Sequence, residues 1–189
     1  MREVIQDAIL ESIRVKEELL KNNLGQIIEI SQKIIASIKK GGKLIIFGNG
    51  GSASDAQHIA AELVGRFKKD RPALAAIALT VNTSILTALA NDFGYDIVFA
   101  RQIEALAKKN DIALGISTSG KAKNVVLGFK QAKKMGLFTI ALTGGDGGDA
   151  VKNADLSLVI SSSVTARVQE CHILVGHIIC ELIEEANAS

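Results

Sequence analysis

The hydrophobic residues of this chain fall into two alternating patterns. Short aliphatic runs occur at residues 44–47, 75–79, 112–116, 137–142 and 156–160. Between and after these runs, apolar residues recur every three or four positions, from residue 55 onward and over 84–90, 96–108, 122–135 and 165–186. Apolar strands that alternate with amphipathic helices predict a parallel sheet covered on both faces. We therefore expect an α/β fold, a three-layer α-β-α sandwich around a five-stranded sheet of the flavodoxin or Rossmann-like type.

Two more amphipathic helices are predicted ahead of the first strand, at residues 3–21 and 24–40. They belong to no strand–helix–strand unit, so their apolar faces must cover the sheet or form a bundle with a second subunit. We favour the second role for at least one of them. The predicted organisation is a single domain over 1–189, with a helical extension at 1–40 that is used in oligomerisation and a parallel core at 41–189.

Composition excludes several classes of function. A chain of 189 residues with 48% hydrophobic residues can bury a substantial core. Its net charge of +2, without a basic stripe interleaved with aromatics, argues against nucleic-acid binding. No apolar run approaches the length of a membrane span and the N-terminus carries charges throughout, which predicts a cytoplasmic protein without membrane contact. Cys171 and Cys180 lie nine residues apart in one predicted helix and imply neither a disulfide nor a CxxC zinc pair.

The loops that follow two of the predicted strands have the composition of anion-binding loops. Right-handed crossovers bring such loops to one edge of a parallel sheet, where ligands of these sheets bind. Asn49, Gly50, Gly51 and Ser52 lie between the first strand and a helix N-terminus, whose free N–H groups and dipole favour an anion. Ser117, Thr118 and Ser119 follow the third strand, open the next helix and offer three hydroxyls without a lysine. An N-cap needs only one such residue, so this run suits a phosphate monoester held by neutral donors.

Two nucleotide-binding alternatives fit less well. Gly48, Gly50 and Ala53 match G-x-G-x-x-A after a strand, as in dinucleotide-binding folds. That fingerprint also needs an acidic residue at the end of the second strand, and the only nearby candidate, Asp70, precedes the strand. The glycine-rich loop also lacks the Lys-Ser/Thr pair of a P-loop nucleotide triphosphatase.

Candidate acid–base or metal-binding residues occur on two predicted helices. His58 and Glu62 are four residues apart and share one face, where they can hold one metal or exchange one proton. A surface His–Glu pair is the ordinary alternative for an arbitrary helix. Gln169 and His177 are eight residues apart on the last helix, about 80° around its axis, so both can point to one side. A histidine within an apolar run, as His177 is, more often belongs to the core.

Taken together, these motifs resemble one family. GNGGS at 48–52, HIAAELVGR at 58–66, NDFG at 91–94, GISTSG at 115–120, LTGGDGG at 142–148 and ARVQECH at 166–172, followed by His177, are similar to the sedoheptulose 7-phosphate isomerases. These are phosphoheptose isomerases of the sugar-isomerase (SIS) fold. The similarity runs from about residue 40 to the C-terminus in the same order and spacing.

The resemblance implies a set of site residues. The expected catalytic pair is Glu62 as base and His177 as acid. One zinc ion per subunit would be bound by His58, Glu62, Gln169 and His177. Contacts to the substrate are expected from Asn49, Gly50, Gly51, Ser52, Glu62, Arg66, Asn91, Asp92 and Gln169, and contacts to its phosphate from Ser117, Thr118 and Ser119. The sequence departs from the family at Ala122, where many members have a further phosphate-binding serine, and at Ala166, where some have an acidic residue.

The resemblance also implies an activity. An aldose–ketose isomerase would convert D-sedoheptulose 7-phosphate to D-glycero-D-manno-heptose 7-phosphate through an enediol(ate). This is the first step of the bacterial heptose biosynthesis that supplies glycans such as lipopolysaccharide or capsule. A homotetramer with sites at subunit interfaces is expected. The alternative is a non-catalytic SIS phosphosugar-binding regulator, such as a protein that associates with a replication initiator. Such a protein needs no acid–base pair, so the presence of both Glu62 and His177 favours an enzyme.

Overall fold

The computed structural model describes residues 1–187 and contains one five-stranded sheet in the order β2-β1-β3-β4-β5. The strands are β1 (Leu44–Gly48), β2 (Ala76–Ala78), β3 (Ile112–Ser117), β4 (Phe138–Gly144) and β5 (Leu156–Ile160). All four neighbouring pairs are parallel. The sheet therefore confirms the predicted parallel α/β fold, and the carboxyl ends of its strands share one edge.

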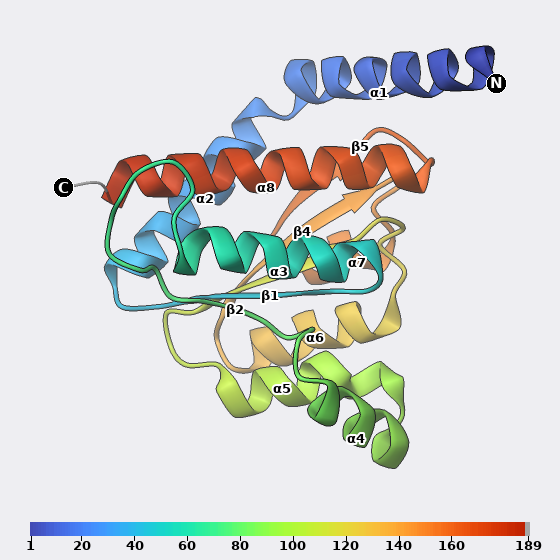
Figure 1. Ribbon diagram of the computed structural model, residues 1–189. Helices are drawn as coiled ribbons and strands as arrows, with labels where there is room; N and C mark the ends of the chain where they lie inside the picture. The colour runs from blue at the N-terminus through green and yellow to red at the C-terminus, as the bar shows by residue number, and fades with distance from the viewer. Residues whose placement is uncertain (188–189) are drawn as a thin grey trace.

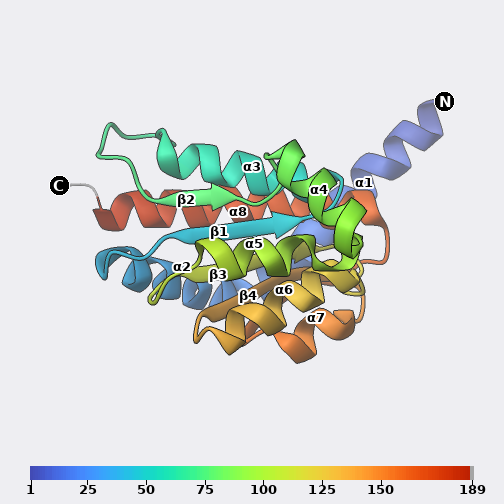
Figure 2. The same ribbon diagram turned by 90° about the horizontal axis from the view of Figure 1, so that it is seen from below.

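Helices cover both faces of this sheet, as Figures 1 and 2 show. One face is covered by α2 (Leu24–Lys39), α3 (Gly51–Val64) and α8 (Thr165–Asn187), with α1 (Arg2–Asn22) lying against α8. The other carries α4 (Thr83–Phe93), the 3-10 turn η1 (Tyr95–Ile97), α5 (Val98–Leu106), α6 (Lys123–Lys134) and α7 (Gly148–Asn153).

The two cores are built by alternate residues of the central strands. In β1, Leu44 and Ile46 pack in the core beneath α2, α3 and α8, whereas Ile45 and Phe47 pack in the core beneath α5 and α6. All four side chains are fully buried. Because successive side chains of a strand point to opposite faces, a strand covered on both sides needs an uninterrupted apolar sequence. This is the physical reason why the aliphatic runs of the sequence predict the strands.

The two N-terminal helices differ in what covers them. Helix α2 buries Ile27, Ile30 and Ile34 in the core beside the sheet. Helix α1 buries only Val15 and Leu19, and its N-terminal end extends past the rest of the molecule (Figure 2). Its remaining large apolar side chains are 47–71% exposed: Val4, Ile5, Ile9, Leu10, Ile13 and Leu20. These side chains give α1 an uncovered apolar face, and the predicted role of the N-terminal helices in oligomerisation stays a prediction.

Three predicted boundaries are wrong, each near a loop. Helix α3 begins at Gly51 rather than at Asp55, because the backbone turns directly from the strand into the helix at Gly50. The segment expected as one helix over 96–108 is divided into η1 and α5. Helix α6 begins at Lys123, so the Ser-Thr-Ser run does not open a helix: Ser117 ends β3, and Thr118 and Ser119 lie in the loop that follows. A helix with the length and hydrophobicity of a membrane span is absent from residues 1–187.

Candidate active site

The loop after β1 presents the N-terminus of α3 at the carboxyl edge of the sheet. Gly50 has φ +55°, a backbone conformation that residues other than glycine rarely adopt. The N–H of Ser52 donates to the carbonyl of Asn49, and the N–H of Ala53 donates to that of Gly50. Ser52 is buried beneath this turn. The glycine-rich loop therefore has the strand–loop–helix geometry that the sequence predicts for an anion site.

A buried asparagine that sequence reasoning missed fixes this loop. Asn49 Nδ2 donates to Asn124 Oδ1 at 2.8 Å, and Asn124 Nδ2 donates back to Asn49 Oδ1 at 2.9 Å. Asn124 lies in the first turn of α6, and the hydroxyl of Tyr95 is 3.4 Å from Asn49 Oδ1. This reciprocal amide pair orients Asn49 from across the sheet edge. The sequence gives no local signal for it because the two residues are 75 positions apart.

A pocket of about 210 Å³ lies between the two loops predicted to bind the substrate. Ser117 ends β3 and is buried, and the N–H of Gly120 donates to its carbonyl to close a tight turn. The pocket is lined by Asn49, Ser52, Ile116, Ser117, Thr118, Ser119, Ala122 and Gln169. The structure thus gathers the Ser-Thr-Ser run with the glycine-rich loop. Ala122 lies in the same wall and contributes no hydroxyl.

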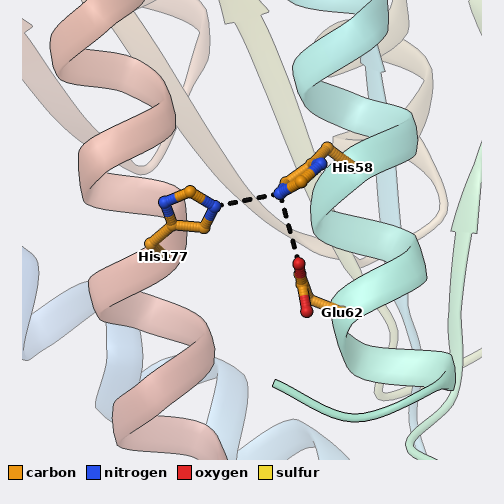
Figure 3. Close-up of side chains that lie close together, drawn as sticks. All are labelled: His58, Glu62 and His177. Carbon is orange, nitrogen blue, oxygen red and sulfur yellow. Dashed lines mark hydrogen bonds and ion pairs between the residues drawn. The ribbon is translucent and has the colours of Figure 1, made fainter. Parts of the chain in front are cut away.

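A second group of polar side chains lies further along α3 and α8. His58 and Glu62 on α3 face His177 on α8 (Figure 3). The Nε2 atoms of the two imidazoles are 2.9 Å apart, and Glu62 Oε1 is 3.2 Å from His58 Nε2. The side chain of His58 is 48% exposed and that of Glu62 is 22% exposed, so a solute can reach both. We call these three residues the His–Glu–His cluster.

The geometry of the His–Glu–His cluster fits a metal ion. One ligand atom from each residue can be chosen so that all lie within 4.8 Å of one another. In a tetrahedral zinc site with bonds of about 2 Å, neighbouring ligand atoms are roughly 3.3 Å apart. The two separations of 2.9 and 3.2 Å are close to this value. Two imidazoles and one carboxylate are also the donor set of catalytic zinc sites that keep a fourth position open.

Gln169, the fourth predicted ligand, lines the pocket. Its amide is so close to the backbone of α3 that a Cβ atom on Gly51 would come within 2.4 Å of Nε2. Eight residues of helix separate Gln169 from His177, a rise of about 12 Å. Both predicted roles of Gln169, as a ligand and as a contact to substrate, stay predictions.

Three predicted substrate contacts lie outside both groups of residues. Arg66 follows the end of α3 and is exposed. Asn91 and Asp92 lie in the last turn of α4, are exposed, and pair with each other through Asn91 Nδ2 and Asp92 Oδ1 at 2.8 Å. The described residues of one chain do not bring these side chains into the pocket, so their predicted roles stay predictions.

The last helix also contains a histidine that belongs to the core. His172 is fully buried, and its Nε2 is 3.2 Å from the carbonyl oxygen of Thr143. A carbonyl only accepts, so Nε2 carries the proton and donates. Burial lowers the pKa of His172 to about 4, although the Thr143 carbonyl favours the charged form. His172 is therefore neutral near pH 7, and its hydrogen bond to Thr143 links α8 to β4.

Asp55 is a further polar residue of α3 that sequence reasoning missed. It precedes His58 by three positions, so the spacing of Asp55, His58 and Glu62 could have identified a common face. Its Oδ2 is buried and has no hydrogen-bond partner within residues 1–187. Burial raises the pKa of Asp55 to about 6, and the positive form of His58 partly opposes this increase.

We expect Asp55→Asn to stabilise the metal-free protein at pH 7. Between about pH 4 and pH 6 the folded chain holds a proton on Asp55 that the unfolded chain releases, so wild-type stability falls as the pH rises through this window. Asp55 is only partly buried, so solvent screening keeps the gain at pH 7 well below the roughly 3 kcal/mol that a shift of about two pKa units would otherwise give. Thermal unfolding at pH 4.5 and 7.0 checks this. The difference in melting temperature between Asp55→Asn and wild type should be smaller at pH 4.5 than at pH 7.0. A difference that does not change with pH contradicts the raised pKa of Asp55.

The pocket and the His–Glu–His cluster lie along the same helix. Ser52 lines the pocket, and His58 follows six residues later, a rise of about 9 Å. Contacts between α3 and α8 continue along this length, from Gly51 beside Gln169 to His58 beside His177. A hydroxyl-lined pocket and a candidate metal and acid–base centre therefore lie along the same pair of helices, α3 and α8.

Comparison with known proteins identifies the family of this chain. The SIS domain family matches residues 9–144. The phosphoheptose isomerase of Aquifex aeolicus is 50% identical over 185 residues, which cover 98% of this chain and 97% of that protein. The probable phosphoheptose isomerase of Thermoplasma acidophilum is 56% identical over 166 residues, covering 88% and 91%. The solved phosphoheptose isomerase of Neisseria gonorrhoeae superposes with a TM-score of 0.93 at 41% identity, covering 97% of this chain and 98% of its own. This chain therefore belongs to the SIS domain family and, within it, to the phosphoheptose isomerases.

Proposed function

We propose that the protein converts D-sedoheptulose 7-phosphate to D-glycero-D-manno-heptose 7-phosphate, with the phosphate in the loop pocket and the reacting carbons at the His–Glu–His cluster. Membership of the phosphoheptose isomerases makes the protein an isomerase that acts on a sugar phosphate. The observation that carries the assignment of the site is the rise of about 9 Å between Ser52 and His58 along α3. The phosphate is at one end of this substrate and the carbons that exchange a proton are at the other.

The loop pocket provides donors that suit a phosphate monoester. Ser117, Thr118 and Ser119 contribute hydroxyls, and the N-terminus of α3 contributes backbone N–H groups and its positive dipole end. Hydrogen bonds to a charged acceptor contribute more than neutral ones. Ala122 removes one such donor relative to many family members, at a cost of roughly 1 kcal/mol or somewhat more.

Proton transfer is assigned to Glu62 and His177. Interconversion of a ketose and an aldose moves a proton between C2 and C1 through an enediol(ate), which needs a base, an acid and stabilisation of the developing oxyanion. Glu62 Oε1 faces His58, so Oε2 is the oxygen we assign to take the carbon-bound proton. His177 supplies a proton to the substrate oxygen, and the two roles exchange in the reverse direction. Zinc bound by His58, Glu62 and His177, with or without Gln169, would supply Lewis acidity toward the substrate oxygens.

The assembly we propose is a homotetramer with sites at subunit interfaces. The exposed apolar side chains of α1 support it, because contiguous apolar surface on this scale is typical of protein contacts. Arg66, Asn91 and Asp92 do not reach the pocket within one chain and would contact substrate at such an interface. We place the protein in the cytoplasm, where the product would enter heptose synthesis for lipopolysaccharide or capsule. A non-catalytic phosphosugar-binding role is the less favoured alternative, since such a role does not need a converging acid–base pair.

Metal binding tests the proposed centre. Metal-stripped wild type should bind one zinc ion per chain in competition with a chromogenic chelator, and His58→Ala should weaken binding by roughly 10-fold to 100-fold or more. Gln169→Ala separates the two roles of that residue. If Gln169 is a ligand its loss weakens zinc affinity, whereas if it contacts only substrate the loss raises KM alone. Unchanged zinc affinity in His58→Ala would contradict the proposed metal site. The reaction itself is tested by following sedoheptulose 7-phosphate with the purified protein.

A further inference from the structure

A buried carboxylate on α8 fixes the segment that follows α3. Glu184 is 1% exposed. Its Oε1 accepts from the backbone N–H of Phe67 at 3.0 Å, and its Oε2 accepts from those of Lys68 and Lys69 at 2.7 and 2.8 Å. Three successive N–H groups of a mostly exposed segment are thus bound by one carboxylate. Both oxygens of Glu184 are used, which limits how the segment can move.

Arg71 connects this carboxylate to the end of α3. Its Nε lies 3.2 Å from Glu184 Oε1, and the two side chains are 1% and 2% exposed. The guanidinium also donates to the carbonyls of Glu62 and Leu63 in the last turn of α3, both at 2.9 Å. Burial alone would raise the pKa of Glu184, but the three N–H donors and Arg71 hold it below its usual value. Glu184 is therefore ionised near neutral pH and links α8, the segment after α3, and α3 itself.

In this arrangement the ring of Phe67 lies against the imidazole of His177. The rings of Phe67 and His177 stack with centroids 5.5 Å apart and an interplanar angle of 26°. On its edge, His177 meets His58, with centroids 5.0 Å apart. An imidazole on a helix can rotate about two side-chain bonds, so a stacked ring restricts the direction in which Nε2 points. Glu184 lies seven residues after His177, about two turns further along α8.

We infer that Glu184 is a positioning residue for His177: by fixing the backbone of residues 67–69 it holds the Phe67 ring against the imidazole, so that Nε2 faces His58 and Glu62. A buried ion pair is rarely the most stable way to anchor a loop, because the desolvation of both charges offsets much of their attraction. In this protein the ion pair matters because it fixes the position of the segment at residues 67–69, not because it adds stability. This inference rests on the proposed function of the His–Glu–His cluster and adds to it a residue that does not touch substrate.

The test compares Glu184→Gln with Phe67→Leu, Phe67→Tyr and Lys69→Ala. Glu184→Gln keeps the shape of the side chain but removes its charge and one of the two oxygens that accept from the three N–H groups. Phe67→Leu keeps the contacts of Glu184 and removes the ring. It therefore still tests the positioning role if Glu184→Gln fails to fold. Phe67→Tyr keeps the ring. Lys69→Ala leaves its own backbone N–H in place and serves as the matched control within the segment.

Three measurements are made on each protein. In metal-free protein, the ring current of Phe67 should shift the proton resonances of His177 upfield, and Glu184→Gln and Phe67→Leu should both lose this shift. Limited trypsin cleavage after Arg66, Lys68 or Lys69 should accelerate in Glu184→Gln but not in Phe67→Leu. With substrate, both variants should lower kcat about 10-fold or more with KM within about twofold, because the phosphate pocket is at the other end of α3. Phe67→Tyr and Lys69→Ala should match wild type in the His177 resonances, in kcat and in the rate of cleavage after Arg66 and Lys68, the two sites that both variants retain.

The positioning role is overturned if Phe67→Leu keeps the wild-type kcat and His177 resonances, or if Glu184→Gln only lowers the melting temperature. Failure of the proposed function gives a different result. Wild type would then show no turnover of sedoheptulose 7-phosphate at all, and the positioning role would fall with it.

Discussion

Glu62→Gln is expected to reduce isomerase turnover by roughly 10²-fold to 10⁴-fold, the contribution typical of a positioned general base. The substitution preserves the shape of the side chain and removes its ability to take a proton from carbon. Glu62 Oε1 lies 3.2 Å from His58 Nε2, so the amide also weakens any metal bound between them. The measurement is kcat and KM at saturating zinc, together with zinc affinity.

Zinc affinity separates the two roles of Glu62. Lost turnover with zinc still bound identifies Glu62 as the base, whereas joint loss of both shows that it is required as a ligand. Glu181→Gln is the matched control, because Glu181 is a half-buried glutamate of α8 whose ion-pair partner within residues 1–187 is Lys68. Turnover within a few-fold of wild type in Glu62→Gln would rule out the assigned acid–base pair.

Gly120→Ala is expected to destabilise the protein by about 3 kcal/mol or more and to raise KM for the sugar phosphate. Gly120 has φ +65°, and a Cβ atom there would lie 2.0 Å from the carbonyl oxygen of Gly147. The residue follows Ser119, so relief of this clash moves the turn that lines the pocket. Backbone strain of about 1–2 kcal/mol adds to an overpacking cost of about 1–3 kcal/mol.

Gly136→Ala separates backbone strain from steric clash. Gly136 has φ +77°, close to that of Gly120, but a Cβ atom there would meet no other atom within 4 Å. Gly136→Ala should lower the free energy of unfolding by about 1–2 kcal/mol and leave KM unchanged. Urea unfolding and steady-state kinetics on both variants give the comparison. Equal stability of the two variants would show that the contact between Gly120 and Gly147 does not constrain the pocket.

The strands and the gathering of the two loops could be predicted because both follow from local pattern. A strand buried on both faces must be apolar throughout, as 44–47 and 112–116 are, and parallel strands place their following loops at one edge. Helical pitch alone places His58 and Glu62 on one face of their helix. The identity of the partner helix came from the family resemblance, and the structure brings His177 to that face.

The parts that could not be predicted depend on contacts between distant residues. The reciprocal pair of Asn49 and Asn124, and the stacking of Phe67 on His177, join positions 75 and 110 residues apart. Helix α3 begins one turn earlier than its apolar periodicity, because Gly51 to Ser54 are small residues that show no amphipathic pattern. The contact of Gln169 with Gly51 joins residues of two helices that are 118 positions apart, which spacing does not encode.

The most direct test of the account follows sedoheptulose 7-phosphate by NMR with metal-stripped protein, before and after one equivalent of zinc per chain is restored. We predict no aldose phosphate before zinc is added and steady formation of D-glycero-D-manno-heptose 7-phosphate afterwards. In D₂O, exchange of the enediol(ate) proton with solvent would add deuterium to the product. If the zinc-loaded protein binds the ketose phosphate but forms no aldose phosphate, the proposed reaction is contradicted.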